Sequence, residues 1–501
     1  MRRSSRGTVI MVALIGATAA AMLLPAAVGF TLREHALARA FLYSASLLAS
    51  VAGLIFLASR GTRTHDSVLS HPFHYLAIAY LLLPALMAIP LTEAEPGMRF
   101  LDAWFEMVAA FTTTGASVID GPGTLSLHLW RALVAWGGGL FTLVAVMALL
   151  APMNLGGFEL FAAQTMRRTD LPDWSHAHRA SYLDEGYSDK SLTRLRDQLA
   201  LVGPIYLGLT LALWVALSIA GNPPLISLIV AMSTLSTSGI LAEPVLMGGV
   251  SEVLIALVLV FALCRRLWPG ATSMAGQEPL RQDMELRLAL VLMAVIVLVL
   301  GVRAGFGAGP GSPGAALAEI WGMAFTALSF LTTTGFVSAH VVGPDGVFAG
   351  PGGLIFLGLA MIGGGVATTA GGLKLMRVFA LFWQARHEVE RLVYPVSVGG
   401  DGPRLRGLRR VGAVSAWLFL MIFIFSLVSL TALLTLTGVH FEDAMIFAVA
   451  ALTTTGPLAQ VAGAEPLLWA DLGGLAKVVM AFGMVLGRLE LLLLLSIFWR
   501  R

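Results

Sequence analysis

The stretch AFTTTGASVID at residues 110–120 places three threonines and a glycine directly after a short apolar run. Near-copies follow along the chain as LSTSGIL, LTTTGFVSA and LTTTGPLAQ, at 235–241, 331–339 and 452–460. A segment that occurs four times indicates an internally repeated architecture. We call these hydroxyl-glycine quartets the four tetrads; they are Thr112, Thr113, Thr114 and Gly115; Ser236, Thr237, Ser238 and Gly239; Thr332, Thr333, Thr334 and Gly335; and Thr453, Thr454, Thr455 and Gly456.

The composition around the tetrads is that of a membrane protein. Of 501 residues, 57% are hydrophobic and 12% are charged, whereas about 25% of the residues in a soluble domain are charged. A helix that crosses a bilayer needs about 20 mostly apolar residues. Ten such runs predict an all-α polytopic fold: 8–30, 37–59, 71–91, 127–151, 198–220, 250–266, 284–302, 352–385, 411–437 and 473–499.

Two further features narrow the class of protein. The single cysteine, Cys264, excludes an intramolecular disulfide and a cysteine-rich metal site. The first run resembles a signal peptide, but a second hydrophobic run follows at once. We therefore expect the first run to be a retained span.

Each tetrad ends a shorter apolar stretch, namely 98–111, 223–235, 316–331 or 441–452. Stretches of about 10–14 residues are too short to span and are typical of re-entrant helices. Aligned on the tetrads, the stretches place bulky apolar residues at three-residue spacing, which predicts one buried helix face in each copy. These residues are Phe105, Val108 and Phe111; Ile229, Met232 and Leu235; Phe325, Leu328 and Leu331; and Ile446, Val449 and Leu452.

The predicted repeat is therefore a span, a short pore helix, a tetrad and a second span, present four times around a pseudo-fourfold pore. The predicted segments are an N-terminal two-span extension at 1–66, pore repeats at 67–154, 198–270, 282–390 and 408–501, and a cytoplasmic loop at 155–197.

Lysine and arginine predict the orientation in the membrane, because cytoplasmic loops are enriched in them. With the N-terminus inside, outward segments hold few basic residues, whereas inward loops hold clusters such as Arg167, Arg168, Arg179, Lys190, Arg194 and Arg196. We therefore expect both termini in the cytoplasm and every tetrad to be reached from outside.

Non-helical backbone at membrane depth must be buried in protein or line an aqueous cavity. Four such segments entering from one side can meet around one axis, where carbonyl oxygens replace the hydration water of a cation. Threonine favours extended backbone and adds a hydroxyl ligand, and glycine permits unusual φ values. Oxygen ligands without a carboxylate in the tetrads favour a monovalent ion. The alternative is that the tetrads are helix caps or small-residue packing sites.

Three further motifs resemble the TrkH/TrkG/KtrB potassium transporters of the superfamily of K+ transporters, and the two extra N-terminal spans resemble TrkH most. The motifs are LHLWRALVAWGGG at 127–139, MIGGGVATTAGGLKLMR at 361–377 and MVLGRLELLLLLSIFWR at 484–500. The resemblance implies K+ uptake across the bacterial inner membrane, a homodimer, and a cytoplasmic TrkA-like nucleotide-binding subunit that docks on 155–197 and 386–410. The chain departs from the family pattern at the second tetrad, at Ala367 and at Pro457.

The run 352–385 contains five glycines within ten residues, and each interior glycine costs a helix about 1 kcal/mol. An unwound loop at 362–373 is therefore expected, and the resemblance implies that it is the gate. Close helix packing on glycine is the alternative. The predicted gate residues are Gly363, Gly364, Gly365, Thr368, Thr369, Gly371, Gly372, Lys374 and Arg488.

Arg488 is charged and lies well inside a predicted span, so it should face protein or water. The resemblance implies that it lies near the pore and the gate loop. We expect it to pair with carbonyls of 363–372 and to repel cations while the loop is closed; a structural salt bridge is the alternative. Lys374 is either a cytoplasmic anchor that snorkels or a functional residue.

Acidic residues gather at the predicted outer side, where they either concentrate cations or form an ordinary solvated face. They are Glu93, Glu95, Asp102, Glu106, Asp120, Glu243, Glu442, Asp443, Glu465 and Asp471. His176 and His178 are weak candidates for a metal site, because a two-residue spacing is not specific.

The predicted function is a gated K+ conduit, with K+ as the transported ion and no organic cofactor. A K+ symporter coupled to Na+ or H+, or a poorly selective Na+/K+ pathway, is the alternative. No nucleophile-base set or Walker motif is present in the sequence, so an enzyme is not expected. The sequence leaves K+ over Na+ selectivity open.

Overall fold

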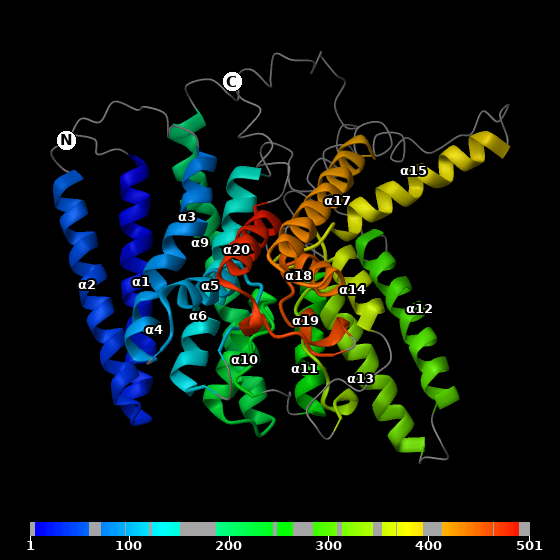
Figure 1. The fold of residues 1–501 in the computed structure, drawn as a ribbon, viewed down its shortest axis with the longest axis horizontal. Coiled ribbons are helices and arrows are strands. Elements are labelled where there is room, and N and C mark those ends of the chain that lie inside the picture. The colour runs from blue at the N-terminus through cyan, green and yellow to red at the C-terminus, as the bar shows by residue number, and fades with distance from the viewer. Residues whose placement is uncertain are drawn as a thin grey trace.

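The computed structural model describes residues 6–59, 72–95, 97–119, 123–150, 187–243, 248–263, 284–307, 313–343, 353–366, 368–393, 413–463 and 465–489. The predicted all-α fold is confirmed (Figure 1). Within the described residues, seven helical segments are long and apolar enough to cross a membrane: Met11–Thr31, His35–Ala58, Leu76–Ala94, Leu125–Ala148, Thr193–Ile219, Glu285–Val302 and Ala413–Leu436.

These spans belong to α1 (Arg6–Thr31), α2 (His35–Ser59), α3 and α4 (Pro72–Met87, Ile89–Ala94), α6 (Leu125–Ala145, extended by a π-helical turn Val146–Leu150), α9 (Tyr187–Ile219), α12 (Met284–Gly307) and α17 (Ala413–Leu436). The other three predicted spans appear as shorter helices, α11 (Val250–Leu259), α14 (Gly353–Ile362) and α20 (Gly474–Arg488).

The four short apolar stretches are helices that end at the tetrads, as predicted: α5 (Phe100–Phe111), α10 (Pro224–Ser236), α13 (Pro313–Leu331) and α18 (Phe441–Leu452). The aligned apolar residues of these pore helices are buried, apart from Leu328, which is partly buried. The three-residue spacing in the sequence therefore marks a packed helix face in every copy.

The pore helices are packed in a cycle. Helix α6 of the first repeat packs against α10 of the second, α11 against α13, α14 against α18, and α20 of the fourth repeat returns to α5 of the first. Each repeat thus supplies the second span that supports the next pore helix. This arrangement closes a four-membered ring from a single chain.

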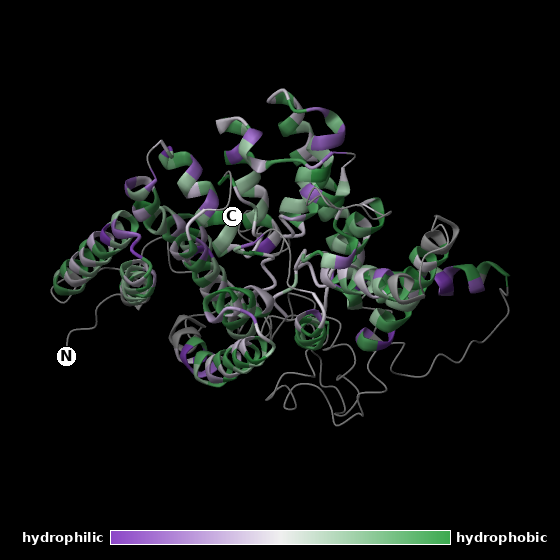
Figure 2. Ribbon diagram, turned by 90° about the horizontal axis from the view of Figure 1, so that it is seen from below, coloured by the Kyte–Doolittle hydropathy of each residue, from purple (hydrophilic) through white to green (hydrophobic). Residues whose placement is uncertain are grey.

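The remaining helices surround this ring. The pair α1 and α2 lies at one edge of the molecule and contacts α6, α3 and α4 (Figure 1). The residues of the long helices are mainly hydrophobic, as the green of the ribbon shows (Figure 2). On α12 and α17 the exposed residues are large and apolar, such as Leu298 and Phe425, which suits contact with lipid.

One boundary differs from the prediction, and one predicted helix break is confirmed. Helix α9 begins at Tyr187, so the last part of the predicted loop 155–197 is helical and the preceding part lies outside the described residues. The run 352–385 is broken as expected: α14 ends at Ile362, a non-helical segment follows, and α15 (Leu375–Val393) projects away from the helical body (Figure 1). Five glycines that each disfavour helix explain the break.

Candidate functional site

All four pore helices end in the same hydrogen-bonded turn. In the first repeat, Thr113 N donates to Ala110 O at 2.8 Å and Thr114 N donates to Ala109 O at 2.8 Å. This is the pattern of a Schellman motif, in which the residue at Thr113 adopts a left-handed conformation that glycine usually supplies. The same pair of bonds ends the other pore helices, at Thr237 and Ser238, Thr333 and Thr334, and Thr454 and Thr455.

The second residue of every tetrad is a threonine with positive φ, between 53° and 57°. A β-branched residue at positive φ is an outlier that costs about 1–3 kcal/mol. The prediction that these threonines are extended is therefore wrong at the second position. It is also wrong at the first position, where Thr112 has φ −77° and ψ 0°. Four strained threonines at equivalent places indicate that the hydroxyl, which glycine lacks, is needed there.

The hydroxyls of each tetrad have different partners. The first hydroxyl returns to its pore helix, as in the 2.7 Å bond from Thr112 Oγ1 to Val108 O, and it also pairs with the third hydroxyl. The same pairing joins Ser236 to Ser238, Thr332 to Thr334 and Thr453 to Thr455.

The second hydroxyl is therefore the one that is not used to end the helix. Thr113 Oγ1 is buried and has no hydrogen-bond partner among the described residues. In the second tetrad, Thr237 Oγ1 donates to the carbonyl of its own neighbour Ser236 at 2.7 Å. A buried hydroxyl without a protein partner is free to coordinate a cation.

Each tetrad glycine lies close to atoms of another repeat around the ring. An ideal Cβ on Gly115 would lie 1.8 Å from Ser238 O, and one on Gly239 would lie 2.2 Å from Thr334 O. A Cβ on Gly335 would lie 2.9 Å from the Pro457 ring, and one on Gly456 would lie 2.7 Å from Thr114 O. The tetrads of repeats one to four thus lie in a closed circle. A side chain at Gly115, Gly239 or Gly456 would collide with a neighbouring tetrad, and one at Gly335 would collide with Pro457, directly after the fourth tetrad.

The fourth tetrad departs from the other three. Gly115, Gly239 and Gly335 have φ values of 71°, 68° and 85°, whereas Gly456 is outside the left-handed region. Gly456 N donates to Thr114 O at 2.6 Å, and Pro457 then starts the short helix α19 (Leu458–Ala462). Glycine is required at Gly456 by close approach to the first repeat rather than by its own φ.

The Pro457 ring reaches across to two other tetrads. It lies 2.8 Å from an ideal Cβ on Gly239 and 2.9 Å from one on Gly335. Gly239 belongs to the second repeat, which is opposite the fourth in the cycle of pore helices. Pro457, which departs from the family pattern, therefore fills the space next to the glycines of the second and third tetrads.

The non-helical segment between α14 and α15, which we call the gate loop, lies directly against the tetrads. Gly371 N donates to Thr333 Oγ1 at 2.7 Å, and Thr369 Oγ1 donates to Leu235 O at 3.2 Å. An ideal Cβ on Gly371 would lie 2.1 Å from Thr453 O. The gate loop thus touches the ends of the second, third and fourth pore helices. Of the predicted gate loop, Ala367 lies outside the described residues.

Hydrogen bonds between backbone groups hold the gate loop in place. Gly365 N donates to Ala262 O and Leu375 N donates to Gly364 O, both at 3.0 Å. Gly363 and Gly372 have φ values of 74° and 77°, so each provides a turn that other residues disfavour. Glu285 at the start of α12 accepts from Val366 N at 3.1 Å, a contact that the sequence did not predict.

Arg488 is buried and connects the gate loop to the first repeat. Its Nη1 donates to Thr369 O at 2.5 Å, and its Nε donates to Thr142 Oγ1 at 3.2 Å. The predicted contact with carbonyls of 363–372 is therefore confirmed, and Thr142 in turn contacts Tyr80 at 2.5 Å. The side chain of Lys374 is buried and its Nζ donates to Ala370 O, so it does not snorkel to solvent.

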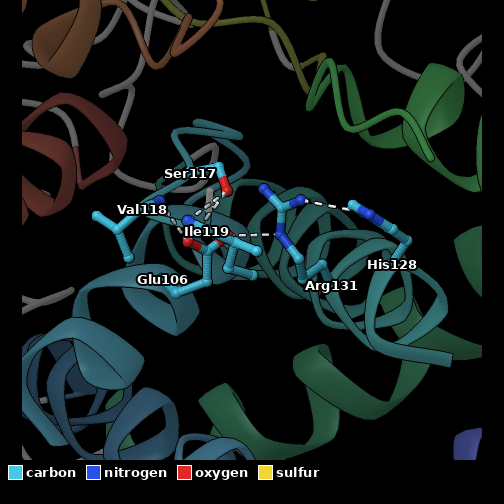
Figure 3. A network of polar contacts seen from close by, with 6 residues as sticks. All are labelled: Glu106, Ser117, Val118, Ile119, His128 and Arg131. Atoms are coloured by element: carbon cyan, nitrogen blue, oxygen red, sulfur yellow. Dashed lines mark hydrogen bonds and ion pairs between the residues drawn. The ribbon is translucent and has the colours of Figure 1, made fainter. Parts of the chain in front are cut away.

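Behind the tetrads, the segments that follow the glycines are held by buried polar side chains. Glu106 of α5 is fully buried and forms an ion pair with Arg131 of α6 at 2.5 Å (Figure 3). The expectation that Glu106 is part of an exposed acidic field is wrong, because the pore helix buries it. Asp102, in the first turn of α5, pairs with Lys477 of α20 at 2.7 Å.

Glu442 and Asp443 lie in the first turn of α18. Among the described residues, no cluster of three or more His, Cys, Asp or Glu side chains could hold a metal ion. His176 and His178 lie outside the described residues.

Comparison with known proteins agrees with this geometry. The family model of TrkH cation transport proteins matches residues 240–499. The Trk system potassium uptake protein TrkG of Escherichia coli is 28% identical over 457 residues, which cover 87% of this chain and 86% of that protein. TrkI of Halomonas elongata is 27% identical over 450 residues, covering 86% of this chain and 84% of that protein.

The crystal structure of the potassium transporter TrkH from Vibrio parahaemolyticus has a TM-score of 0.78 to this chain at 24% sequence identity, covering 98% of both chains. This match shows that the chain has the same multi-span helical fold. The family is one of transport proteins rather than of enzymes, and its model covers more than half of the sequence. The chain therefore belongs to the TrkH family of cation transport proteins.

Proposed function

We propose that this chain takes up K+ through the ring of tetrads. The observation that carries the proposal is the closed circle in which each tetrad glycine lies against the next tetrad or, for Gly335, against the proline that directly follows it. Around such an axis, backbone carbonyls and the four second-position hydroxyls replace hydration water of an alkali ion. The homologues are named as potassium uptake proteins, which supports K+ as the ion.

The strain at the second position supports the same function. Thr113, Thr237, Thr333 and Thr454 each remain at positive φ, although glycine would relieve the cost. The gain is a hydroxyl at the inner end of the filter, where Thr113 Oγ1 has no hydrogen-bond partner among the described residues. A cage of neutral oxygen ligands, without a carboxylate, suits a monovalent cation. It binds the ion weakly enough for the ion to leave the filter again, as conduction requires.

The gate loop would control passage beneath the filter. Its contacts with Thr333 and Leu235 support this role, and the Arg488 guanidinium donates to Thr369 O of the same loop. A positive charge buried beside the path repels K+, so the closed state combines a steric block with an electrostatic barrier. Opening requires the loop to exchange these hydrogen bonds for new partners.

The assembly around this pore is also a proposal. We assign pore repeats to 67–154, 198–270, 282–390 and 408–501, after an extension at 1–66, with both termini in the cytoplasm of a bacterial inner membrane. A homodimer and a cytoplasmic nucleotide-binding subunit that docks on 155–197 and 386–410 complete the system. The membership of the homologues in Trk systems supports a partner of this kind.

Rubidium uptake by K+-transport-deficient cells tests the proposal, with Gly335→Ser as the disabled variant. We expect the wild-type chain to restore uptake and Gly335→Ser to abolish it, because a side chain there meets the Pro457 ring. Absence of uptake by a wild-type chain that is present in the membrane overturns the proposal. Uptake that depends on Na+ or pH would instead identify a coupled symporter.

A further inference from the structure

We propose that two buried carboxylates, Glu106 and Glu252, are positioning residues for the outer half of the filter in the first and third repeats. This inference rests on the proposed function, because it explains how the oxygen ligands of the tetrads would be held at the spacing that fits one ion. Neither residue belongs to a tetrad or to the gate loop.

Glu106 braces the segment that follows the first tetrad. Its Oε2 accepts from Val118 N at 2.8 Å and from Ser117 Oγ at 3.4 Å, three and two residues after Gly115 (Figure 3). Ser117 Oγ also accepts from Ile119 N at 3.2 Å. The carboxylate, which lies on the pore helix, is thus bonded to the extended segment that leaves the filter.

The charge of Glu106 is compensated locally. Arg131 Nε lies 2.5 Å from Glu106 Oε1, and Arg131 Nη1 donates to His128 Nδ1 at 3.3 Å. Both members of the ion pair are buried, with at most 5% of either side chain exposed. A buried carboxylate without this partner would be strongly unfavourable, so Arg131 allows Glu106 to sit behind the filter.

Glu252 performs the equivalent bracing in the third repeat, although it comes from α11 of the second. Its Oε1 accepts from Ser338 Oγ at 2.7 Å and from Ala339 N at 3.0 Å, three and four residues after Gly335. Its Oε2 accepts from Trp321 Nε1 at 3.0 Å, and the residue is fully buried. A carboxylate offers only acceptors, which matches these three donors.

The two braces lie on opposite repeats of the ring, because the cycle of pore helices places the third repeat across from the first. In the fourth repeat, a neutral donor contacts the tetrad itself: Trp469 Nε1 donates to Gly456 O at 3.1 Å. In the snug-fit account of ion selectivity, carbonyl oxygens that are held at one cavity size favour the ion that fits that size. The geometry therefore assigns Glu106 and Glu252 to ion selectivity rather than to conduction itself.

The test compares Glu106→Gln and Glu252→Gln with a matched control, Asp102→Asn. Asp102 lies one turn before Glu106 on the same pore helix, and its ion pair with Lys477 does not touch a segment that follows a tetrad. We expect each glutamine variant to lower the K+/Na+ permeability ratio of the purified protein in liposomes by about tenfold, the loss of one hydrogen bond to a charged group. Asp102→Asn should leave the ratio unchanged.

A charge swap, Glu106→Arg with Arg131→Glu, separates positioning from structural pairing. The swap can restore an ion pair, but it moves the carboxylate off α5 and away from Val118 N. In the swap, we expect amide hydrogen exchange at 116–119 to be faster than in the wild type. We expect the K+/Na+ permeability ratio to be as low as in the Glu106→Gln variant. Restored selectivity in the swap, or unchanged selectivity in the conducting glutamine variants, would overturn this inference alone. A wild-type chain that carries no K+ would overturn the proposed function.

Discussion

The backbone N–H of Gly371 donates to Thr333 Oγ1 at 2.7 Å, which joins the gate loop to the strained threonine of the third tetrad. The same hydroxyl that would face an ion in the conducting filter therefore holds the loop in place in this structure. The proposed filter and the proposed gate therefore share a polar atom, so the loop cannot leave without freeing that hydroxyl.

Thr333→Val should favour the open state. Valine keeps the β-branched shape but removes the acceptor, so the buried N–H of Gly371 loses its partner in the closed state. We expect K+ flux to increase by about tenfold, as for a destabilisation of the closed state by about 1.4 kcal/mol. Thr237→Val is the matched control, since Thr237 Oγ1 donates within its own tetrad. Equal effects of the two variants would contradict a specific link.

Arg488→Gln should also increase K+ flux, again by about tenfold, because both the repelling charge and a charged hydrogen bond to Thr369 O are lost. Thr142→Val is the comparison variant, because it removes another partner of Arg488 but keeps both the charge and the hydrogen bond to Thr369 O. We expect the smaller change from Thr142→Val in flux measurements on liposomes. A decrease of flux in Arg488→Gln would be inconsistent with an electrostatic barrier.

Gly138→Ala should destabilise the protein, whereas Gly137→Ala should not. An ideal Cβ on Gly138 would lie 2.0 Å from Phe111 O at the end of the first pore helix, and nothing lies within 4 Å of one on Gly137. Overpacking costs about 1–3 kcal/mol or more, while alanine in a free helical position gains about 0.5–1 kcal/mol. Thermal unfolding in detergent measures both. Similar unfolding temperatures would show that α6 can shift.

Pro457→Ala should lower K+ over Na+ selectivity. The ring lies within 3 Å of ideal Cβ positions on Gly239 and Gly335, so its removal leaves space between three tetrads. Reversal potentials under K+/Na+ gradients measure the change, which we expect to be about tenfold at most, in line with one lost packing contact of about 1 kcal/mol. Gln460→Ala, at an exposed position on α19, is the control. An unchanged ratio would show that the ring only packs.

Much of the fold could be read from the residues. Periodic apolar residues such as Phe105 and Val108 gave the pore helices their length and buried face, and the glycines of 363–372 gave the break after α14. Such local signals are reliable because they depend on neighbours along the chain. The conformation of Thr113 was predicted wrongly, because intrinsic preference favours extended backbone and the Schellman turn overrides it.

The partners of charged residues could not be predicted in this way. Glu106 was placed on an outer acidic face, yet it meets Arg131 inside the protein, and Glu252 braces a segment 87 residues later in the chain. Glu285 likewise reaches the gate loop across 81 residues. No sequence spacing encodes such contacts, because they arise only when helices and loops that are distant along the chain pack together.

The sequence by itself determined that four hydroxyl-glycine segments end four short helices in a multi-span chain, because apolar periodicity and glycine content act locally. Only the tertiary structure decided how those segments serve a site: the ring of glycines, the left-handed threonines and the buried Glu106–Arg131 pair. The physical reason is that burial and close approach around an axis depend on helices brought together from the whole chain, and these forces are strong enough to override local preference.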